Sequence, residues 1–248
     1  MNKKVIVEIC VESLESAIAA QESGADRIEL CSDLLEGGLT PSAGLIKLVV
    51  NTLKIPVNVL IRPRSGDFFY SDYEFIVMKE DVKLAKELKA NGVVFGILNT
   101  DGTIDKDRTR ELIELARPMK ITFHRAFDMT RDPMEALDNL IELGVDRILT
   151  SGQKGSAYDG RELIKELVIR AEERITIMPG GGINASNAKQ IIEKCSVLQI
   201  HSSASEKVLS RMVYRNPKAF MGKGDSLSEY ELRVASATKI KSLVEAVK

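Results

Sequence analysis

Residues 5–31, VIVEICVESLESAIAAQESGADRIELC, hold two short apolar runs on either side of one helical stretch. The runs VIVEIC and RIELC are rich in β-branched residues, as buried strands are. Six further runs of this kind begin near residues 57, 93, 120, 147, 175 and 197, with helical stretches between them. Eight such repeats predict parallel βαβ units and a single α/β domain over residues 1–248, a (β/α)₈ barrel of the TIM type.

A repeated turn between helix and strand supports this reading. The phrase GADRI at residues 24–28 recurs as GVDRI at residues 144–148, which indicates that one structural unit is reused. The alternative, an open doubly wound sheet, typically carries a GxGxxG turn after its first strand, and this sequence has none there. A loop with Asn216, Pro217, Gly222 and Gly224 precedes a last predicted helix, from about residue 229 to the C-terminus.

The charge balance excludes several classes of partner. The chain has 35 basic and 36 acidic residues with no long run of one sign, so we expect no nucleic-acid or membrane partner. No apolar run approaches the roughly eighteen residues of a membrane span, and the start, MNKKVIVEICVES, is too charged for a signal peptide. Three widely spaced cysteines fit reduced thiols, so the expected location is cytoplasmic.

Side chains alternate between the faces of a strand, so a charged residue in a barrel strand is expected to point inward, away from the helix layer. Glu8 and Cys10 share this face in the first run, and Glu29 and Cys31 share it in the second. In (β/α)₈ enzymes the active site lies at the C-terminal ends of the strands. The same alternation places further inward residues near those ends: Asn58, Arg62, Arg64, Thr122, His124, Thr176, Met178, Gln199 and His201.

The only two histidines of the chain, His124 and His201, both fall at that rim. Together with Glu29 they are candidates for general acids and bases, and a histidine can also bind metal. The other charged positions are candidates for binding a small anion: Glu8, Arg62 and Arg64. The alternative is a structural network in which these carboxylates pair with these arginines inside the barrel.

The cysteines of the first two runs occupy matching positions on neighbouring strands. Because adjacent strands lie about 4.8 Å apart, Cys10 and Cys31 are placed to bind one ion. Thiolates prefer Cu(I) or Zn(II), and Met178 or a histidine could add a ligand. The alternative is that both are buried core residues, which is how we interpret Cys195.

A glycine-rich segment, PGGGIN at residues 179–184, follows the seventh run. Barrel enzymes often bind phosphate with the loops after strands seven and eight, using backbone N–H groups and a helix N-terminus. Gly180, Gly181 and Gly182 therefore predict an anion site, to which Ser151 and Ser202 are placed to contribute. The alternative is a tight turn without a ligand.

Several segments together resemble the CutC copper-homeostasis family: EICVES, GADRIELC, EGGLTPS, IRPRSGDF, VVFGIL, TFHRAFD, RILTSG, MPGGGI and the ending HSS at residues 201–203. The resemblance covers nearly the whole chain. It implies a TIM barrel, a cytoplasmic location and a role in copper handling, with Cys10 and Cys31 as the Cu(I) ligands. One departure is Ser65, where the family usually has a glycine, so a positive φ there would strain the loop.

The sequence therefore leaves two hypotheses for the function. The first is a copper-homeostasis protein whose partner is a copper ion, Cu(I), bound by thiols at the rim of the barrel. The alternative is a TIM-barrel enzyme acting on a small phosphorylated or carboxylated metabolite. A homodimer is compatible with either, whereas a scaffold role has little support because the unusual residues point inward.

Overall fold

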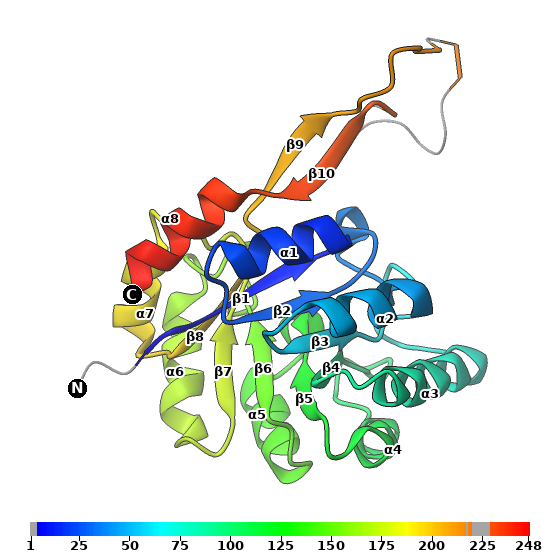
Figure 1. Cartoon of the computed structure of the whole chain (residues 1–248). Helices are drawn as coiled ribbons and strands as arrows, with labels where there is room; N and C mark the ends of the chain where they lie inside the picture. Colours follow the sequence, from blue (N-terminus) through cyan, green and yellow to red (C-terminus); the bar gives the residue numbers. More distant parts are fainter. Residues whose placement is uncertain (1–3, 217, 220–228) are drawn as a thin grey trace.

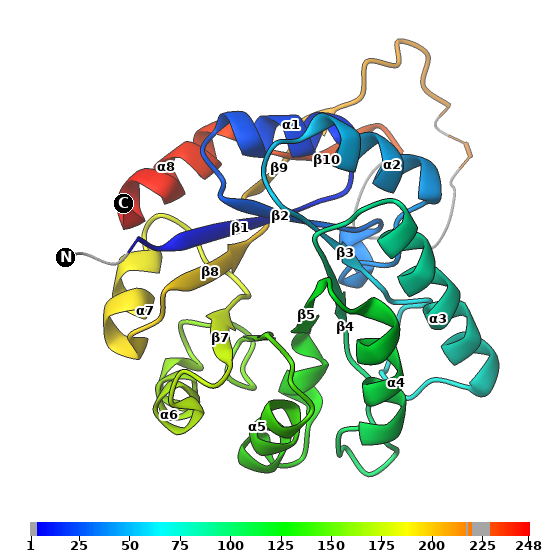
Figure 2. The same cartoon turned by 60° about the horizontal axis from the view of Figure 1, so that its bottom comes forward.

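The computed structural model describes residues 4–216, 218–219 and 229–248. Eight parallel strands form one sheet in the order β7-β6-β5-β4-β3-β2-β1-β8, and β7 and β8 lie next to each other at the remaining seam (Figures 1 and 2). The predicted (β/α)₈ barrel is confirmed. The barrel strands are β1 (Ile6–Val11), β2 (Arg27–Leu30), β3 (Val57–Leu60), β4 (Gly92–Phe95), β5 (Lys120–Phe123), β6 (Arg147–Thr150), β7 (Thr176–Pro179) and β8 (Gln199–Ser202).

Helices surround the barrel, as Figure 2 shows from its open end. Most begin at a residue whose side chain accepts a hydrogen bond from the first turn, such as Ser71, which forms a capping box with Glu74. The α-helices are α1 (Leu14–Glu22), α2 (Ala43–Thr52), α3 (Asp72–Glu87), α4 (Lys106–Ala116), α5 (Pro133–Glu142), α6 (Arg161–Ala171), α7 (Ala188–Cys195) and α8 (Ala237–Val247). None of the helices in the described residues is both long and apolar enough to cross a membrane.

The aspartate of the repeated turn makes the same type of hydrogen bond in both places. Oδ2 of Asp26 accepts from the backbone N–H of Val7 at 3.0 Å, and Oδ2 of Asp146 accepts from that of Ile121 at 2.9 Å. Each aspartate therefore ties the start of its own strand to the start of the neighbouring one. The arginine that follows it, Arg27 or Arg147, is buried inside the barrel.

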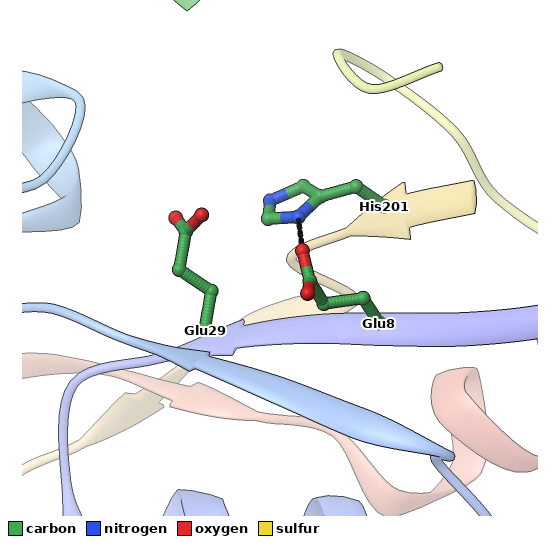
Figure 3. Close-up of side chains that lie close together, drawn as sticks. All are labelled: Glu8, Glu29 and His201. Atoms are coloured by element: carbon green, nitrogen blue, oxygen red, sulfur yellow. Dashed lines mark hydrogen bonds and ion pairs between the residues drawn. The ribbon is translucent and has the colours of Figure 1, made fainter. Parts of the chain in front are cut away.

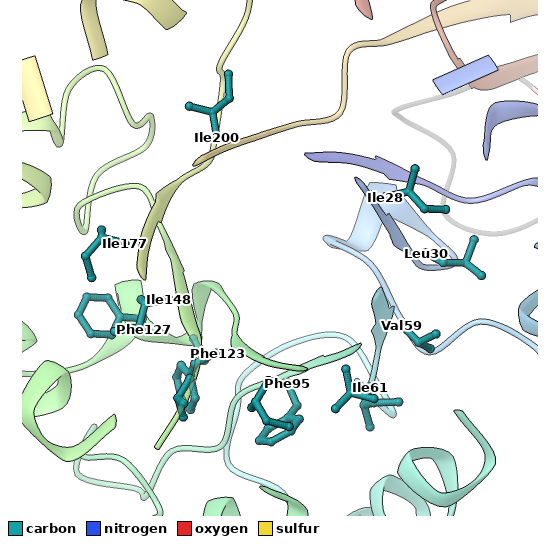
Figure 4. Close-up of a cluster of buried hydrophobic side chains, with 14 of the residues drawn as sticks. Ile28, Leu30, Val59, Ile61, Phe95, Phe123, Phe127, Ile148, Ile177 and Ile200 are labelled. Atoms are coloured by element: carbon teal, nitrogen blue, oxygen red, sulfur yellow. The ribbon is translucent and has the colours of Figure 1, made fainter. Parts of the chain in front are cut away.

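The main hydrophobic core lies between the strands and the helices. Apolar residues at alternate strand positions point outward from the barrel, as Figure 4 shows for Ile28, Phe95 and Ile200 among others. The inward positions carry most of the buried polar residues, together with a few apolar ones such as Leu60 and Leu149. Gly92 illustrates how tightly they fill the interior, because a Cβ there would lie 2.4 Å from Oδ1 of Asn58.

The C-terminal part departs from the prediction. Residues Glu231–Ala235 form a strand, β10, that pairs antiparallel with β9 (Ser205–Leu209), and the last helix begins only at Ala237. The hairpin projects from the barrel in Figure 1. The predicted helical start near residue 229 is therefore wrong, because this segment satisfies its backbone groups by strand pairing. Of the loop residues named above, Pro217, Gly222 and Gly224 lie outside the described residues.

Candidate active site

A pocket of about 420 Å³ opens at the C-terminal ends of the strands. Its walls come from the ends of β1, β2, β3, β6 and β8 and from the loops that follow β2, β3, β5, β7 and β8. Eight of the residues predicted from the sequence line it: Cys10, Glu29, Arg62, His124, Gly181, Gly182, His201 and Ser202. The prediction that inward polar residues meet at one rim therefore corresponds to a real cavity.

Beneath the pocket, Glu8 is the centre of a buried polar network. Its Oε2 forms an ion pair with Nε of Arg27 and accepts from Nδ2 of Asn58 at 3.1 Å, and its Oε1 faces Nδ1 of His201 at 2.8 Å. Burial opposes ionisation of this carboxyl, but Arg27 and His201 outweigh that cost and hold the pKa of Glu8 well below its usual range. Glu8 is therefore a fixed negative charge.

His201 carries the compensating charge on the pocket side. Burial alone would lower the pKa of this imidazole, but Cys10, Glu29 and Glu8 raise it well above the usual value. The hydrogen bond from Nδ1 to Glu8 fixes the ring, and Figure 3 shows the other ring nitrogen turned toward Glu29. A carboxylate that orients a histidine in this way is common behind catalytic and metal-binding histidines.

Glu29 differs from Glu8 in having no compensating partner for one of its oxygens. It is 6% exposed, and its Oε2 has no hydrogen-bond partner among the described residues. Burial, and to a smaller extent Glu8, raise the pKa of Glu29 to about 7, against the opposing effect of His201. Ligand atoms of Glu8, Glu29 and His201 all lie within 4.8 Å of one another, which is compact enough for a metal ion or for proton transfer.

His124 is held as a neutral ring. Its Nδ1 accepts from the backbone N–H of Ala126 at 3.1 Å, and Phe68 packs on it with ring centroids 4.9 Å apart. Burial, helped by the positive charge of Arg62, lowers the pKa of His124 to about 3. Gly96 leaves the room for this ring, because a Cβ there would lie 2.7 Å from it.

The two arginines of the IRPRSGDF segment take different directions. Arg62 is buried and donates to three backbone carbonyls, those of Glu36, Gly38 and Gly66. Arg64 lies outside the pocket and pairs with Glu74 and with Asp67.

Neither arginine of this segment pairs with Glu8 or Glu29. The alternative of a structural network between these carboxylates and these two arginines is therefore wrong, because Arg27 takes that place beside Glu8. The positive φ of this segment falls on Gly66, at +86°, and not on Ser65, so the serine causes no strain there.

The predicted match of Cys10 with Cys31 on neighbouring strands is wrong, because the register places Cys10 opposite Glu29 and Cys31 lies just beyond the end of β2. The two thiols also differ in access. Cys10 lines the pocket, whereas Cys31 is fully buried behind Leu34 and Leu60, with its Sγ 3.5 Å from the carbonyl oxygen of Val11. Burial, and then the neighbouring Cys10, raise the pKa of the Cys31 thiol far above its usual value.

The two other sulfur residues considered above, Met178 and Cys195, contact other groups. Met178 is occupied elsewhere, since its Sδ accepts from Arg27 at 3.3 Å. Cys195 lies in the outer core against α6, as predicted.

The glycine loop after β7 is partly a packing feature and partly a pocket wall. Gly180 lies against Leu149, whose Cδ1 would be 2.5 Å from an added Cβ. Gly181 and Gly182 line the pocket with φ of +104° and +73°, which favour glycine. Ser202 lines it too, and its Oγ donates to the carbonyl of Ile183 at 2.7 Å.

Ser151 and two residues that the sequence reasoning missed form a clamp beside the pocket. Asp128 accepts from the backbone N–H of Ser151 at 3.0 Å and pairs with Nε of Arg125 at 2.8 Å, while Arg125 also reaches Oγ of Ser151 at 2.7 Å. Arg125 and Asp128 line the pocket, and Ser151 stands behind them. Their signal in the sequence is the HRAFD phrase directly after the fifth run.

Comparison with known proteins finds one family that matches nearly the whole chain. Residues 5–206 match the family model described as the CutC family. The chain is 50% identical over 238 residues to the copper homeostasis protein cutC homolog of Mus musculus, covering 96% of this chain and 88% of the mouse protein. It is 45% identical over 243 residues to the family protein CutC of Mesorhizobium japonicum, covering 98% of this chain and 94% of that one.

Solved structures agree with the fold. The crystal structure of the putative copper homeostasis protein CutC from Streptococcus agalactiae matches with a TM-score of 0.77 and 36% identity, over 80% of this chain and 98% of that chain. Phosphoribosylanthranilate isomerase from Thermotoga maritima matches with a TM-score of 0.58 at 15% identity, over 98% of both chains. The second likeness bears on the barrel fold alone.

Proposed function

The chain belongs to the CutC family, and from that premise we propose that it is a copper-homeostasis protein that binds Cu(I) as its cargo through Cys10 and Cys31. The observation that carries the proposal is the placement of the two thiols. Cys10 lies on β1 and lines the pocket, and Cys31 directly follows the neighbouring strand β2 and is buried behind the pocket wall. Thiolate sulfur is the kind of ligand that Cu(I) prefers.

The surroundings of the thiols support a soft ion. Leu34, Leu60 and Val94 pack around Cys31 and keep water from it. His201 lies beside Cys10 and would become a third ligand only after losing the proton that it carries. Binding would release the thiol protons, because the thiolate is the ligand. All three cysteines are free, and a reducing cytoplasm is the location in which they would stay so.

A competition titration with a chromophoric Cu(I) chelator under reducing conditions tests the proposal. Cys10→Ser and Cys31→Ser should each weaken Cu(I) binding strongly, and the double variant should abolish it. Cys195→Ser is the matched control, since that thiol lies in the outer core, and it should bind as the unmodified chain does. Equal Cu(I) affinity in the unmodified chain and the double variant would remove these residues as ligands.

A second candidate is a barrel enzyme that acts on a small phosphorylated or carboxylated metabolite. The observation that favours it is Glu29, a buried carboxyl with an unpartnered oxygen that faces His201 in the pocket. Glu29 and His201, and in a second position His124, would then serve as acid and base. Arg62 and Arg125 supply positive charge, and Gly181, Gly182 and Ser202 complete the wall.

A thermal-shift screen with phosphorylated and carboxylated metabolites tests this candidate. A ligand at a hundred times its dissociation constant should stabilise the fold by about 2.7 kcal/mol. The absence of any shift across a broad set of anions would count against it. A homodimer stays a prediction of the sequence, and sedimentation of the purified chain would decide it.

A further inference from the structure

Three unpartnered polar atoms gather in one pocket. In the described part of the chain, five buried side-chain nitrogen and oxygen atoms have no hydrogen-bond partner. Three of them belong to residues that line this cavity, namely Oε2 of Glu29, Nε of Arg62 and Nε2 of His124, and each of these residues is only 6% exposed. A folded protein seldom leaves a buried polar atom unpaired, so such a cluster indicates a polar ligand.

The hydrogen bonds of His124 settle what its free nitrogen offers. Because Nδ1 accepts from the backbone N–H of Ala126, the neutral ring carries its proton on Nε2. Nε2 is therefore a donor. It cannot pair with an incoming cation or with another N–H group, only with an acceptor such as an oxygen.

The unpartnered Nε–H of Arg62 is also a hydrogen-bond donor, and it belongs to a positively charged group. The terminal nitrogens of Arg62 donate to the carbonyls of Glu36, Gly38 and Gly66, and the buried Tyr70 hydroxyl lies beside the same guanidinium. Nε–H has no hydrogen-bond partner among the described residues. Phe68 contacts both residues, with the guanidinium 5.2 Å from the ring centroid on one side and the His124 ring on the other. No carboxylate among the described residues pairs with Arg62, and His124 adds a neutral donor beside it, so an anionic acceptor fits this wall.

We propose that Arg62 Nε–H and His124 Nε2–H bind an oxyanion, a carboxylate or a phosphate, whose own hydroxyl group hydrogen-bonds Oε2 of Glu29. The ligand is thus a small hydroxylated oxyanion. This inference rests on the second of the two functions above and names the class of molecule that the pocket would take. The pocket volume of about 420 Å³ suits a compound of this size.

Isothermal titration with matched probes tests both ends of the ligand. Glycerate and glycerol 3-phosphate carry the oxyanion and a hydroxyl group, propionate lacks the hydroxyl group, and glycerol lacks the anion. We expect the unmodified chain to bind one of the two hydroxylated anions at least tenfold more tightly than propionate or glycerol. The stronger of the two identifies the carboxylate or the phosphate.

Two variants assign the donors and the acceptor. His124→Phe keeps a ring against Phe68 but removes the N–H group, and it should weaken the preferred anion at least tenfold. Glu29→Leu should remove the preference for the hydroxylated anion over propionate. Arg64→Gln is the matched control, because this arginine lies outside the pocket, and its affinities should be unchanged.

Nitrogen-15 spectra of the histidine rings add a readout that a folding defect alone would not give, because the Nε2 signal of His124 should shift when the anion binds to the unmodified chain. Equal affinity in the unmodified chain and in His124→Phe would overturn the assignment of the donors while leaving an anion pocket in place. No binding of any probe would overturn the assignment and the second function together. Cu(I) titration reports on the first function independently.

Discussion

Oε1 of Glu8 and Nδ1 of His201 lie 2.8 Å apart inside the barrel, and this contact joins the structural network below to the pocket above. Glu8 also pairs with Arg27, so one carboxylate holds two cations in place. Removing one member of a buried ion pair leaves an uncompensated charge, which is costly. The network therefore serves both the stability of the barrel and the orientation of His201.

Glu8→Gln should consequently destabilise the fold by about 3–5 kcal/mol, the range for breaking a buried pair. Urea unfolding followed by circular dichroism measures it. Asp138→Asn is the control, because the pair of Asp138 with Arg170 is about half exposed and should contribute only about 0–1 kcal/mol. If both variants lose the same small amount of stability, the Glu8 network is not a structural element.

The depressed pKa of His124 predicts a pH dependence of stability. The ring is neutral in the folded chain down to a pKa of about 3, whereas in the unfolded chain it takes up a proton near pH 6.5. The unfolded state therefore binds more protons in that window, so the contribution of His124 to stability is lost as the pH falls from about 6.5 toward 3.

A comparison of variants isolates this contribution. The free energy of unfolding of the unmodified chain should fall faster below pH 6.5 than that of His124→Phe, with a difference of up to about 1.4 kcal/mol per pH unit. The other titrating groups are common to both chains and cancel in the difference. Parallel curves would mean that His124 takes up its proton at the same pH in the folded and unfolded states.

The fold and much of the pocket followed from the sequence because both depend on local alternation. Within a strand the inward and outward positions are fixed by geometry, so Glu8, Cys10 and Glu29 could be assigned to the interior from parity alone. Arg27 lies two residues before Glu29 in the second run, so its side chain is on the same face of the strand. The alternation therefore also predicts an interior position for Arg27, opposite Glu8 on the neighbouring strand.

The alternation of side chains could not predict the direction of residues beyond the end of a strand. β3 stops at Leu60, so Arg62 and Arg64 belong to a loop whose direction depends on tertiary contacts. Hydrogen bonds to backbone carbonyls hold Arg62 in the pocket wall, whereas an ion pair with Glu74 on α3 holds Arg64 outside the pocket. The C-terminal hairpin escaped prediction for a related reason, since its strands pair with each other outside the barrel and follow none of its repeat.

Gly96→Ala should disturb the pocket through His124. The new Cβ would lie 2.7 Å from the imidazole, so the ring must move, at a cost of about 1–3 kcal/mol in unfolding free energy. Gly155→Ala is the control, because nothing lies within 4 Å of its added Cβ. Thermal unfolding measures both, and an unchanged melting temperature for Gly96→Ala would show that the His124 site is loosely packed.

The unequal access of the thiols predicts their order of reaction with a small alkylating reagent. Cys10 lines the pocket, while Cys31 and Cys195 are fully buried, so iodoacetamide should modify Cys10 first in the folded chain. Mass spectrometry of tryptic peptides follows the three sites separately, and Cys10→Ser should leave the folded chain almost unlabelled. Cu(I) bound at Cys10 should slow the labelling, because the metal occupies the sulfur that the reagent attacks. Equal rates at all three cysteines would mean that labelling requires global unfolding, and the pocket would then give no route to the thiols.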